Sequence, residues 1–316
     1  MLRFVLSLSA LMLPAPAAAV AVQTPTFPGG FARPPAPGHM VEVDEGRRLH
    51  ILCKGSGEGP TVIFEAGLSQ YTANSTYGAA QDAIATFARV CTYDRAGLGW
   101  SDPAPEGWTQ EGMVRDLHRL LGTAQLPGPY IIVGHSLGGL LARTYARTYP
   151  GEVAGLVLVD ATTERDFPGF DAARGSVVAQ IDSALAGARP GVPVVGLPLG
   201  TSPETALSFT PEVLRGVKVE FQALERLPAT MRQPGGFGTL GDLPLVIIRR
   251  GKTAQPPSPE DEAHRVGQEA LARLSTNSML IVAENSGHAV MLDEPQVLAG
   301  AVRRMLEAVR SDAPLS

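Results

Sequence analysis

Short apolar or alternating runs recur along the chain, and stretches with helical periodicity separate several of them. Because apolar strands that alternate with helices are typical of a parallel sheet covered on both faces, the pattern predicts an α/β fold. The first two runs are joined by Glu45-Gly46 and predict a hairpin. The expected strands are at residues 40–44, 48–53, 61–64, 88–93, 130–133, 153–160, 243–248 and 278–283. Helices are expected at residues 79–87, 109–121, 140–149 and 295–309.

The alternation lapses between residues 161 and 241, where glycine, proline and helix-forming pieces take its place. This segment follows the sixth predicted strand, so we expect an insertion above the sheet, in the position of a lid. A separate domain is disfavoured, because roughly 80 residues without an apolar pattern of their own make a weak core. The phenylalanines of the segment can line a pocket or pack the insertion, and packing is favoured. They are Phe167, Phe170, Phe209, Phe221 and Phe237.

The N-terminus has the pattern of a secretory signal peptide. Arg3 supplies a positive charge, residues 4–13 form an apolar run, and small residues allow cleavage after Ala19 or Ala21. The apolar run is shorter than the roughly 20 residues of a membrane-spanning helix. We therefore expect export to the periplasm or the medium, without stable membrane insertion after cleavage. The expected organisation is a signal peptide at residues 1–21, a flexible lead-in rich in proline at 22–38, and one domain at 39–316.

Composition narrows the classes of function. The chain has 316 residues, of which 44% are hydrophobic, enough for one large domain with a sizeable core. Lys and Arg number 26 against 31 Asp and Glu, the net charge is −5 and no basic stretch stands out, so a nucleic-acid partner is not expected. Two cysteines are present, Cys53 and Cys91, and in an exported protein such a pair indicates one disulfide.

A serine flanked by glycines lies between a predicted strand and a predicted helix. Ser136 stands in the segment Gly134–Gly139, directly after the run at residues 130–133. A very tight turn of this kind exposes the serine hydroxyl at the sheet edge, and the glycines let strand and helix approach closely. We therefore expect Ser136 to be a catalytic nucleophile rather than one residue of a glycine-rich turn.

A serine nucleophile needs a base, which is usually a histidine oriented by a carboxylate. Among the six histidines, His288 differs because it follows directly on the last predicted strand. It therefore lies in a loop at the same sheet edge as Ser136, and we expect it to be the base.

The carboxylate should come from the chain between Ser136 and His288. Asp160 ends the strand after the serine's helix, and a helix that rises about 18 Å followed by a strand of about 23 Å returns the chain to the same edge. The rivals Glu260, Asp261 and Glu262 follow Ser258-Pro259, which is typical of a helix start, so those acids have a structural role. The capping pattern favours Asp160 and leaves the other three as alternatives.

Two backbone amides should stabilise the oxyanion that forms during attack. One is the amide of Leu137, directly after the nucleophile. The other should come from the sharp exit of the third strand at Gly67-Leu68. We expect the Leu68 amide, with Ser69 as the alternative.

Together these residues resemble the α/β-hydrolase superfamily, and the resemblance covers roughly residues 40–160 and 241–316. It implies an α/β-hydrolase fold, with a mostly parallel eight-stranded sheet flanked by helices and a helical lid inserted after strand six. It also implies that the second and fourth strands are neighbours, which places Cys53 beside Cys91 and predicts a disulfide between them. The segments that carry the resemblance are Glu65-Ala66-Gly67, residues 93–101, residues 134–139 and Ser286-Gly287-His288.

The chain also departs from common members of that family. Many members have His-Gly at the oxyanion turn, where this chain has Ala66-Gly67 after Glu65. Many place the acid after the seventh strand, whereas some use the end of the sixth, which fits Asp160. Epoxide hydrolases and haloalkane dehalogenases of this fold have an aspartate at the elbow, so Ser136 argues against both.

The expected function is therefore a serine hydrolase that cleaves a small to medium acyl compound, most simply a carboxylic ester, through an acyl-enzyme on Ser136. A lactonase, amidase or aminopeptidase of the same fold is an alternative. A catalytically idle ligand-binding protein is another, because one fold hosts many functions. No metal or cofactor is expected, since no cysteine–histidine cluster has metal-ligand spacing.

Overall fold

The computed structural model describes residues 33–70, 76–194, 202–233 and 235–315. The predicted signal peptide and the lead-in up to residue 32 lie outside the described residues. Residues 33–38 run along the protein, because Arg33 Nη2 donates to the Gly99 carbonyl at 2.8 Å and Trp100 Nε1 donates to the Pro34 carbonyl at 2.9 Å. No helix in the described ranges is long and apolar enough to cross a membrane.

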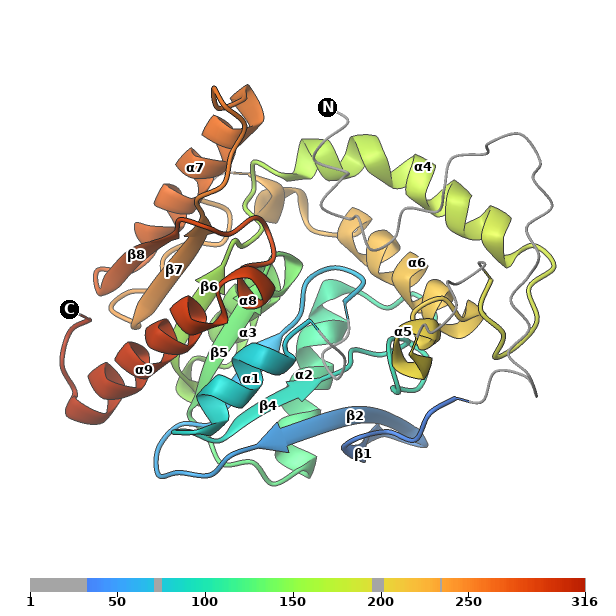
Figure 1. Ribbon diagram of the computed structural model, residues 1–316, viewed down its shortest axis with the longest axis horizontal. Coiled ribbons are helices and arrows are strands. Elements are labelled where there is room, and N and C mark those ends of the chain that lie inside the picture. Colours follow the sequence, from blue (N-terminus) through green and yellow to red (C-terminus); the bar gives the residue numbers. More distant parts are fainter. Residues whose placement is uncertain (1–32, 71–75, 195–201, 234, 316) are drawn as a thin grey trace.

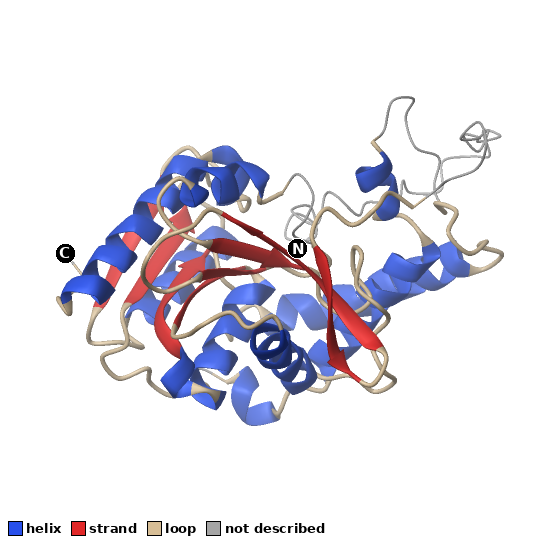
Figure 2. Cartoon of the chain, turned by 90° about the horizontal axis from the view of Figure 1, so that it is seen from below, coloured by secondary structure: helices blue, strands red, loops and turns tan. Residues whose placement is uncertain are grey.

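An eight-stranded sheet forms the centre of the molecule, with helices on both faces (Figure 1 and Figure 2). The strand order is β1-β2-β4-β3-β5-β6-β7-β8, with β1 and β2 paired antiparallel, β2 and β4 antiparallel, and the other pairs parallel. The prediction of a mostly parallel α/β-hydrolase sheet is confirmed. The strands are β1 His39–Asp44, β2 Arg47–Lys54, β3 Val62–Glu65, β4 Val90–Tyr93, β5 Tyr130–His135, β6 Val153–Val159, β7 Leu245–Arg250 and β8 Ser278–Ala283.

Alternate residues of the central strands pack into two separate cores. Ile132 lies in the core that includes α2 and α3, whereas its neighbours Ile131 and Val133 lie in the core that includes α1 and α9. This period of two is what continuous apolar strands require when both faces are covered. The helices are α1 Gly78–Ala85, α2 Gln110–Thr123, α3 Leu137–Thr148, α4 Phe167–Leu185, α5 Pro203–Leu207, α6 Pro211–Glu225, α7 Pro259–Ala272, α8 Val290–Asp293 and α9 Pro295–Ser311, with 3₁₀ turns η2 Pro150–Glu152 and η3 Ala229–Arg232.

Between β6 and β7 the described chain forms α4, α5, α6 and η3, and α4 packs along α6 (Figure 1). Phe167, Phe221 and Phe237 are buried in the larger core, and Phe170 packs against it. These phenylalanines pack the insertion, as the sequence favoured. A role of the insertion as a lid stays a prediction.

A disulfide joins Cys53 of β2 to Cys91 of β4. The two residues face each other in the antiparallel register of these strands. The disulfide that the family resemblance implied is therefore confirmed.

Replacing both cysteines, Cys53→Ala with Cys91→Ala, is expected to lower the free energy of unfolding by about 2–4 kcal/mol, because the cross-link restricts the unfolded chain. Urea denaturation of the wild type and the double variant measures the difference. In parallel, the denatured but unreduced wild type should contain no free thiol from these residues. Two titratable thiols per chain would contradict the prediction.

Candidate active site

Ser136 occupies a sharp turn between β5 and α3. It is a non-glycine residue with φ 51° and ψ −120°, a conformation that costs roughly 1–3 kcal/mol and persists only where the surroundings impose it. The Ser136 N–H donates to the Val159 carbonyl at 3.1 Å, and its carbonyl accepts from the Thr162 N–H at 2.9 Å. The structure therefore holds this serine in the strained turn that the sequence predicted.

Close backbone approaches explain the glycines on either side of Ser136. A Cβ atom at Gly134 would lie 2.5 Å from the Gly138 carbonyl oxygen, and one at Gly138 would lie 2.0 Å from the Glu65 carbonyl oxygen. Any side chain at these positions would force the backbones apart. The second approach also brings the start of α3 against the end of β3.

His288 follows β8 and lies beside the residue that precedes the serine. The rings of His135 and His288 have their centroids 4.6 Å apart, and His135 Nε2 donates to the His288 carbonyl oxygen at 2.9 Å. His288 Nδ1 lies 2.6 Å from Asp160 Oδ2. Because an ionised carboxylate only accepts hydrogen bonds, Nδ1 donates to Asp160, which in a neutral ring leaves the lone pair on Nε2.

Asp160 follows β6 and is fully buried. Its Oδ1 accepts from His264 Nε2 at 2.7 Å and from the Arg250 N–H at 3.0 Å, and its Oδ2 accepts from Arg250 Nη1 at 2.8 Å as well as from His288. Burial alone would raise the pKa of Asp160, but the hydrogen bonds from His264 and His288 outweigh it and hold that pKa well below its ordinary value. Asp160 is therefore an ionised acceptor at neutral pH.

The alternative acids lie at the start of α7, as their sequence context indicated. Asp261 and Ser258 form a capping box, in which Ser258 Oγ accepts from the Asp261 N–H at 3.1 Å and Asp261 Oδ2 accepts from the Ser258 N–H at 3.0 Å. Glu262 pairs with Arg265 at 2.5 Å on the exposed side of the helix. In the part of the chain that the structure describes, His288 hydrogen-bonds to Asp160, and neither Asp261 nor Glu262 shares a hydrogen bond with His288.

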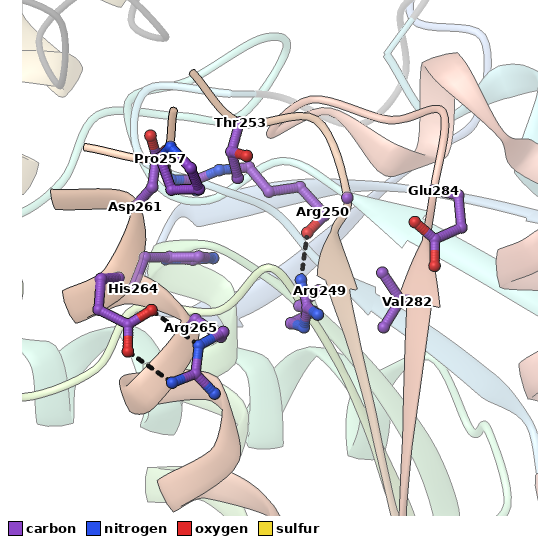
Figure 3. A pocket seen from close by; sticks show the side chains of 11 residues that line it. Arg249, Arg250, Thr253, Pro257, Asp261, His264, Arg265, Val282 and Glu284 are labelled. Atoms are coloured by element: carbon purple, nitrogen blue, oxygen red, sulfur yellow. Dashed lines mark hydrogen bonds and ion pairs between the residues drawn. The ribbon is translucent and has the colours of Figure 1, made fainter. Parts of the chain in front are cut away.

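A pocket of about 220 Å³, lined mainly by charged and polar residues, lies between α7 and the ends of β7 and β8 (Figure 3). Its lining includes His264 and Arg250, both of which contact Asp160, whereas Ser136 and His288 do not line it. The pocket therefore borders two partners of Asp160, and neither Asp160 itself nor Ser136 lines it.

The sequence interpretation missed His264 and Arg250 as partners of Asp160. The buried residues of α7 are His264, Gly267, Gln268 and Leu271, spaced as one face of a helix. That spacing was the available signal that His264 points into the protein.

In the turn after β3, the backbone N–H of Leu68 differs from those of its neighbours in its hydrogen bonding. The Gly67 N–H donates to the Tyr77 hydroxyl at 3.1 Å, the Ser69 N–H to Glu220 Oε2 at 2.7 Å, and the Gln70 N–H to the Gly67 carbonyl at 3.2 Å. Within the described residues, the Leu68 N–H has no such acceptor. Leu137 is the first residue of α3, so its N–H has no partner within the helix.

The same comparison separates the two predicted candidates at this turn. The Ser69 N–H, the alternative donor, is bonded to Glu220, whereas the Leu68 N–H has no acceptor among the residues that the structure describes. Gly138, the residue after Leu137, lies against the carbonyl oxygens of Glu65 and Ala66, the residues that lead into the turn at Gly67-Leu68.

His135 is buried and neutral. Burial, with the nearby His288, lowers the pKa of His135 to about 3. The unfolded chain takes up a proton on this residue below its ordinary pKa of 6.5, whereas the folded chain does not until about 3. Its contribution to stability is therefore complete above pH 6.5 and is lost as the pH falls toward 3.

Between about pH 6 and pH 4, the free energy of unfolding of the wild type should fall more steeply than that of His135→Gln, by about 1.4 kcal/mol per pH unit. Urea denaturation of both proteins across this range measures the two slopes. Parallel slopes would show that the folded protein accepts a proton on His135 as readily as the unfolded chain.

Comparison with known proteins adds three findings. The sequence profile of the alpha/beta hydrolase family matches residues 66–301. The uncharacterized protein YqjL of Bacillus subtilis is 26% identical over 260 residues, which cover 82% of this chain and 88% of that protein. Several other curated relatives match over less than half of their own length.

Two solved structures share the fold at low sequence identity. A thermophilic esterase from Thermogutta terrifontis has a TM-score of 0.62 and 21% identity, over 86% of this chain and 98% of that one. A putative lipase from Acinetobacter baumannii has a TM-score of 0.65 and 22% identity, over 87% of this chain and 92% of that one.

Proposed function

The chain belongs to the alpha/beta hydrolase family, and we propose that it is a serine hydrolase that cleaves small to medium carboxylic esters. The observation that carries the proposal is the hydrogen bond of 2.6 Å between His288 Nδ1 and Asp160 Oδ2, next to a serine held in a strained turn. A ligand-binding protein has no need of this arrangement. The likeness to an esterase and a putative lipase supports ester chemistry.

In the proposed mechanism, Ser136 Oγ attacks the ester carbonyl carbon and His288 Nε2 accepts the hydroxyl proton. The negative charge on the carbonyl oxygen is stabilised by the amides of Leu68 and Leu137. His288 then gives its proton to the leaving alcohol, which departs and leaves an acyl group on Ser136. A water molecule, deprotonated by His288, releases the acid and restores the serine.

Asp160 acts through His288 in each half of this cycle. Its negative charge stabilises the imidazolium that forms when Nε2 is protonated, and its hydrogen bond fixes the ring orientation. Arg250 and His264 hold the carboxylate in place. The site needs no metal or cofactor to perform these steps.

The experiment that tests the proposal is turnover of p-nitrophenyl esters of increasing acyl length, with the matching p-nitroanilides as amide controls. We expect hydrolysis of the esters with a preference for short to medium acyl groups, and much slower release from the anilides. Faster anilide cleavage would indicate an amidase or aminopeptidase. Binding without any turnover would indicate a ligand-binding protein.

We also propose that the protein is exported. The disulfide between Cys53 and Cys91 supports an oxidising compartment. N-terminal sequencing of protein recovered from the periplasm or medium should give a chain that begins at residue 20 or 22. Recovery of uncleaved chain from the cytoplasm alone would contradict it.

A further inference from the structure

A buried arginine joins the turn after β3 to a helix of the insertion. Arg95 Nη1 lies 2.8 Å from Glu65 Oε1, and Arg95 Nε lies 2.5 Å from Glu220 Oε1. All three side chains are at most 3% exposed. Glu65 ends β3, Arg95 lies in the loop after β4, and Glu220 belongs to α6, so one ionic cluster connects three distant segments.

This cluster also binds the backbone on both sides of Leu68. Arg95 donates to the Ala66 carbonyl at 2.7 Å and to the Gly67 carbonyl at 2.6 Å. Glu220 Oε2 accepts from the Ser69 N–H at 2.7 Å. The two peptide groups before Leu68 and the one after it are thus held by charged side chains.

The conformation of the turn explains why such support is needed. Ser69 is a non-glycine residue with φ 62°, in the left-handed region. A carboxylate that accepts from a backbone amide makes a stronger hydrogen bond than a neutral acceptor does. Glu220 therefore stabilises a backbone conformation that the local sequence does not favour.

Helix α6 packs so closely against the loop after β4 that the position of Glu220 is fixed. A Cβ atom at Gly216 would lie 2.2 Å from the Gly97 carbonyl oxygen, so α6 and the loop after β4 touch backbone to backbone. Glu220 lies four residues after Gly216, on the same face of the helix. This contact fixes the height and rotation at which Glu220 meets Ser69.

Burying these charged side chains costs free energy, which indicates that the cluster does more than attach α6 to the rest of the protein. Buried ion pairs are often no more stabilising than apolar side chains of the same size. A helix can be attached by apolar contacts alone, as Phe221 and Leu224 of α6 illustrate. What apolar contacts cannot do is bind the polar groups of the turn.

We propose that Glu220 is a positioning residue, which holds the turn after β3 so that the Leu68 amide faces the developing oxyanion. The inference rests on the proposed function, and it assigns to the insertion a part in transition-state stabilisation. Because Glu220 is fully buried, its loss should change the rate of the chemical step rather than substrate binding.

The experiment compares Glu220→Gln with Glu225→Gln, a control on the same helix whose carboxylate pairs with Arg174 at the surface. For oxygen esters, Glu220→Gln should lower kcat by about 10–100-fold, less than full loss of an oxyanion donor, with KM changed by less than about twofold. Glu225→Gln should leave both constants unchanged.

Thionoesters, in which sulfur replaces the carbonyl oxygen, distinguish a loss of oxyanion stabilisation from general structural damage to the site. Their sulfur is a weak hydrogen-bond acceptor, so oxyanion donors contribute less to their hydrolysis. The loss of rate in Glu220→Gln should therefore be several-fold smaller for a thionoester than for its oxygen ester. Equal losses on both substrates, or an unchanged kcat, would overturn the inference.

If Glu220→Gln does not fold, the hydrogen bond of the Ser69 amide can be measured in the wild type instead. The Ser69 amide proton should resonate downfield and exchange slowly with solvent, because a carboxylate accepts its hydrogen bond. Exchange at the rate of an exposed loop amide would overturn the inference. A wild type that hydrolyses no ester would instead contradict the proposed function.

Discussion

Ser136→Ala is expected to lower kcat/KM for ester hydrolysis by about 10⁵-fold or more, because the proposed acyl-enzyme forms on the Ser136 hydroxyl. The remaining rate would come from the oxyanion donors and from substrate binding. Since Ser136 has a positive φ, alanine at this position keeps the backbone strain without the hydroxyl. The fold should therefore survive, and circular dichroism with steady-state kinetics checks both expectations.

The matched control is Ser183→Ala, which removes a hydroxyl from the exposed face of α4. Its kcat/KM should stay within about twofold of the wild type, as expected for surface substitutions. A folded Ser136→Ala protein with more than about a tenth of wild-type activity would rule out an obligatory serine nucleophile.

Asp160→Asn is expected to lower kcat by about 10⁴-fold, the loss typical of this exchange in a Ser-His-Asp site. An asparagine can turn its amide N–H toward His288 Nδ1, which then accepts, so the proton moves to Nε2. In that tautomer His288 cannot take the proton of Ser136. Steady-state kinetics at neutral pH measures the loss.

Asp261→Asn is the control that separates the two candidate acids. Asp261 caps α7, so its replacement should cost stability of about 1 kcal/mol or less and leave kcat within a few-fold. A large loss of activity in Asp261→Asn with a small one in Asp160→Asn would move the acid to the start of α7.

The parts of the molecule that depend on local order could be predicted from the sequence. Strands with continuous apolar residues, the elbow around Ser136 and the cap at Ser258 each follow from neighbouring residues. Asp160 could be placed because a helix and a strand of known rise return the chain to its starting edge. The pairing of Cys53 with Cys91 required the strand order, which the family resemblance supplied.

The contacts that could not be predicted join segments far apart in the sequence. In the sequence, Glu220 is one charged residue of an amphipathic helix, and such a residue is predicted to lie in solvent. Its burial depends on the contact between Gly216 and Gly97, which the sequence alone does not indicate. The helix of His264 presents it to the core, but nothing near His264 in the sequence indicates that it meets Asp160, which lies 104 residues away.

The folded chain thus supplies contacts that hold the residues of the site in place, and local sequence patterns do not reveal these contacts. His264 and Arg250 bind Asp160, and Glu220 with Arg95 binds the backbone of the turn after β3. These residues come from α7, β7, α6 and the loop after β4. The site therefore depends on elements that only the folded chain brings together.

The position of a fluorophosphonate adduct shows which residue of the protein is the nucleophile, and we expect Ser136. The serine oxygen displaces fluoride and forms a stable bond to phosphorus. Cleavage after Arg119 and Arg143 gives a peptide of residues 120–143 in which Ser136 is the single serine. We predict one adduct per chain by intact mass, located on this serine by fragmentation of the peptide. An unmodified wild-type protein, or an adduct on another residue, would show that Ser136 is not the nucleophile.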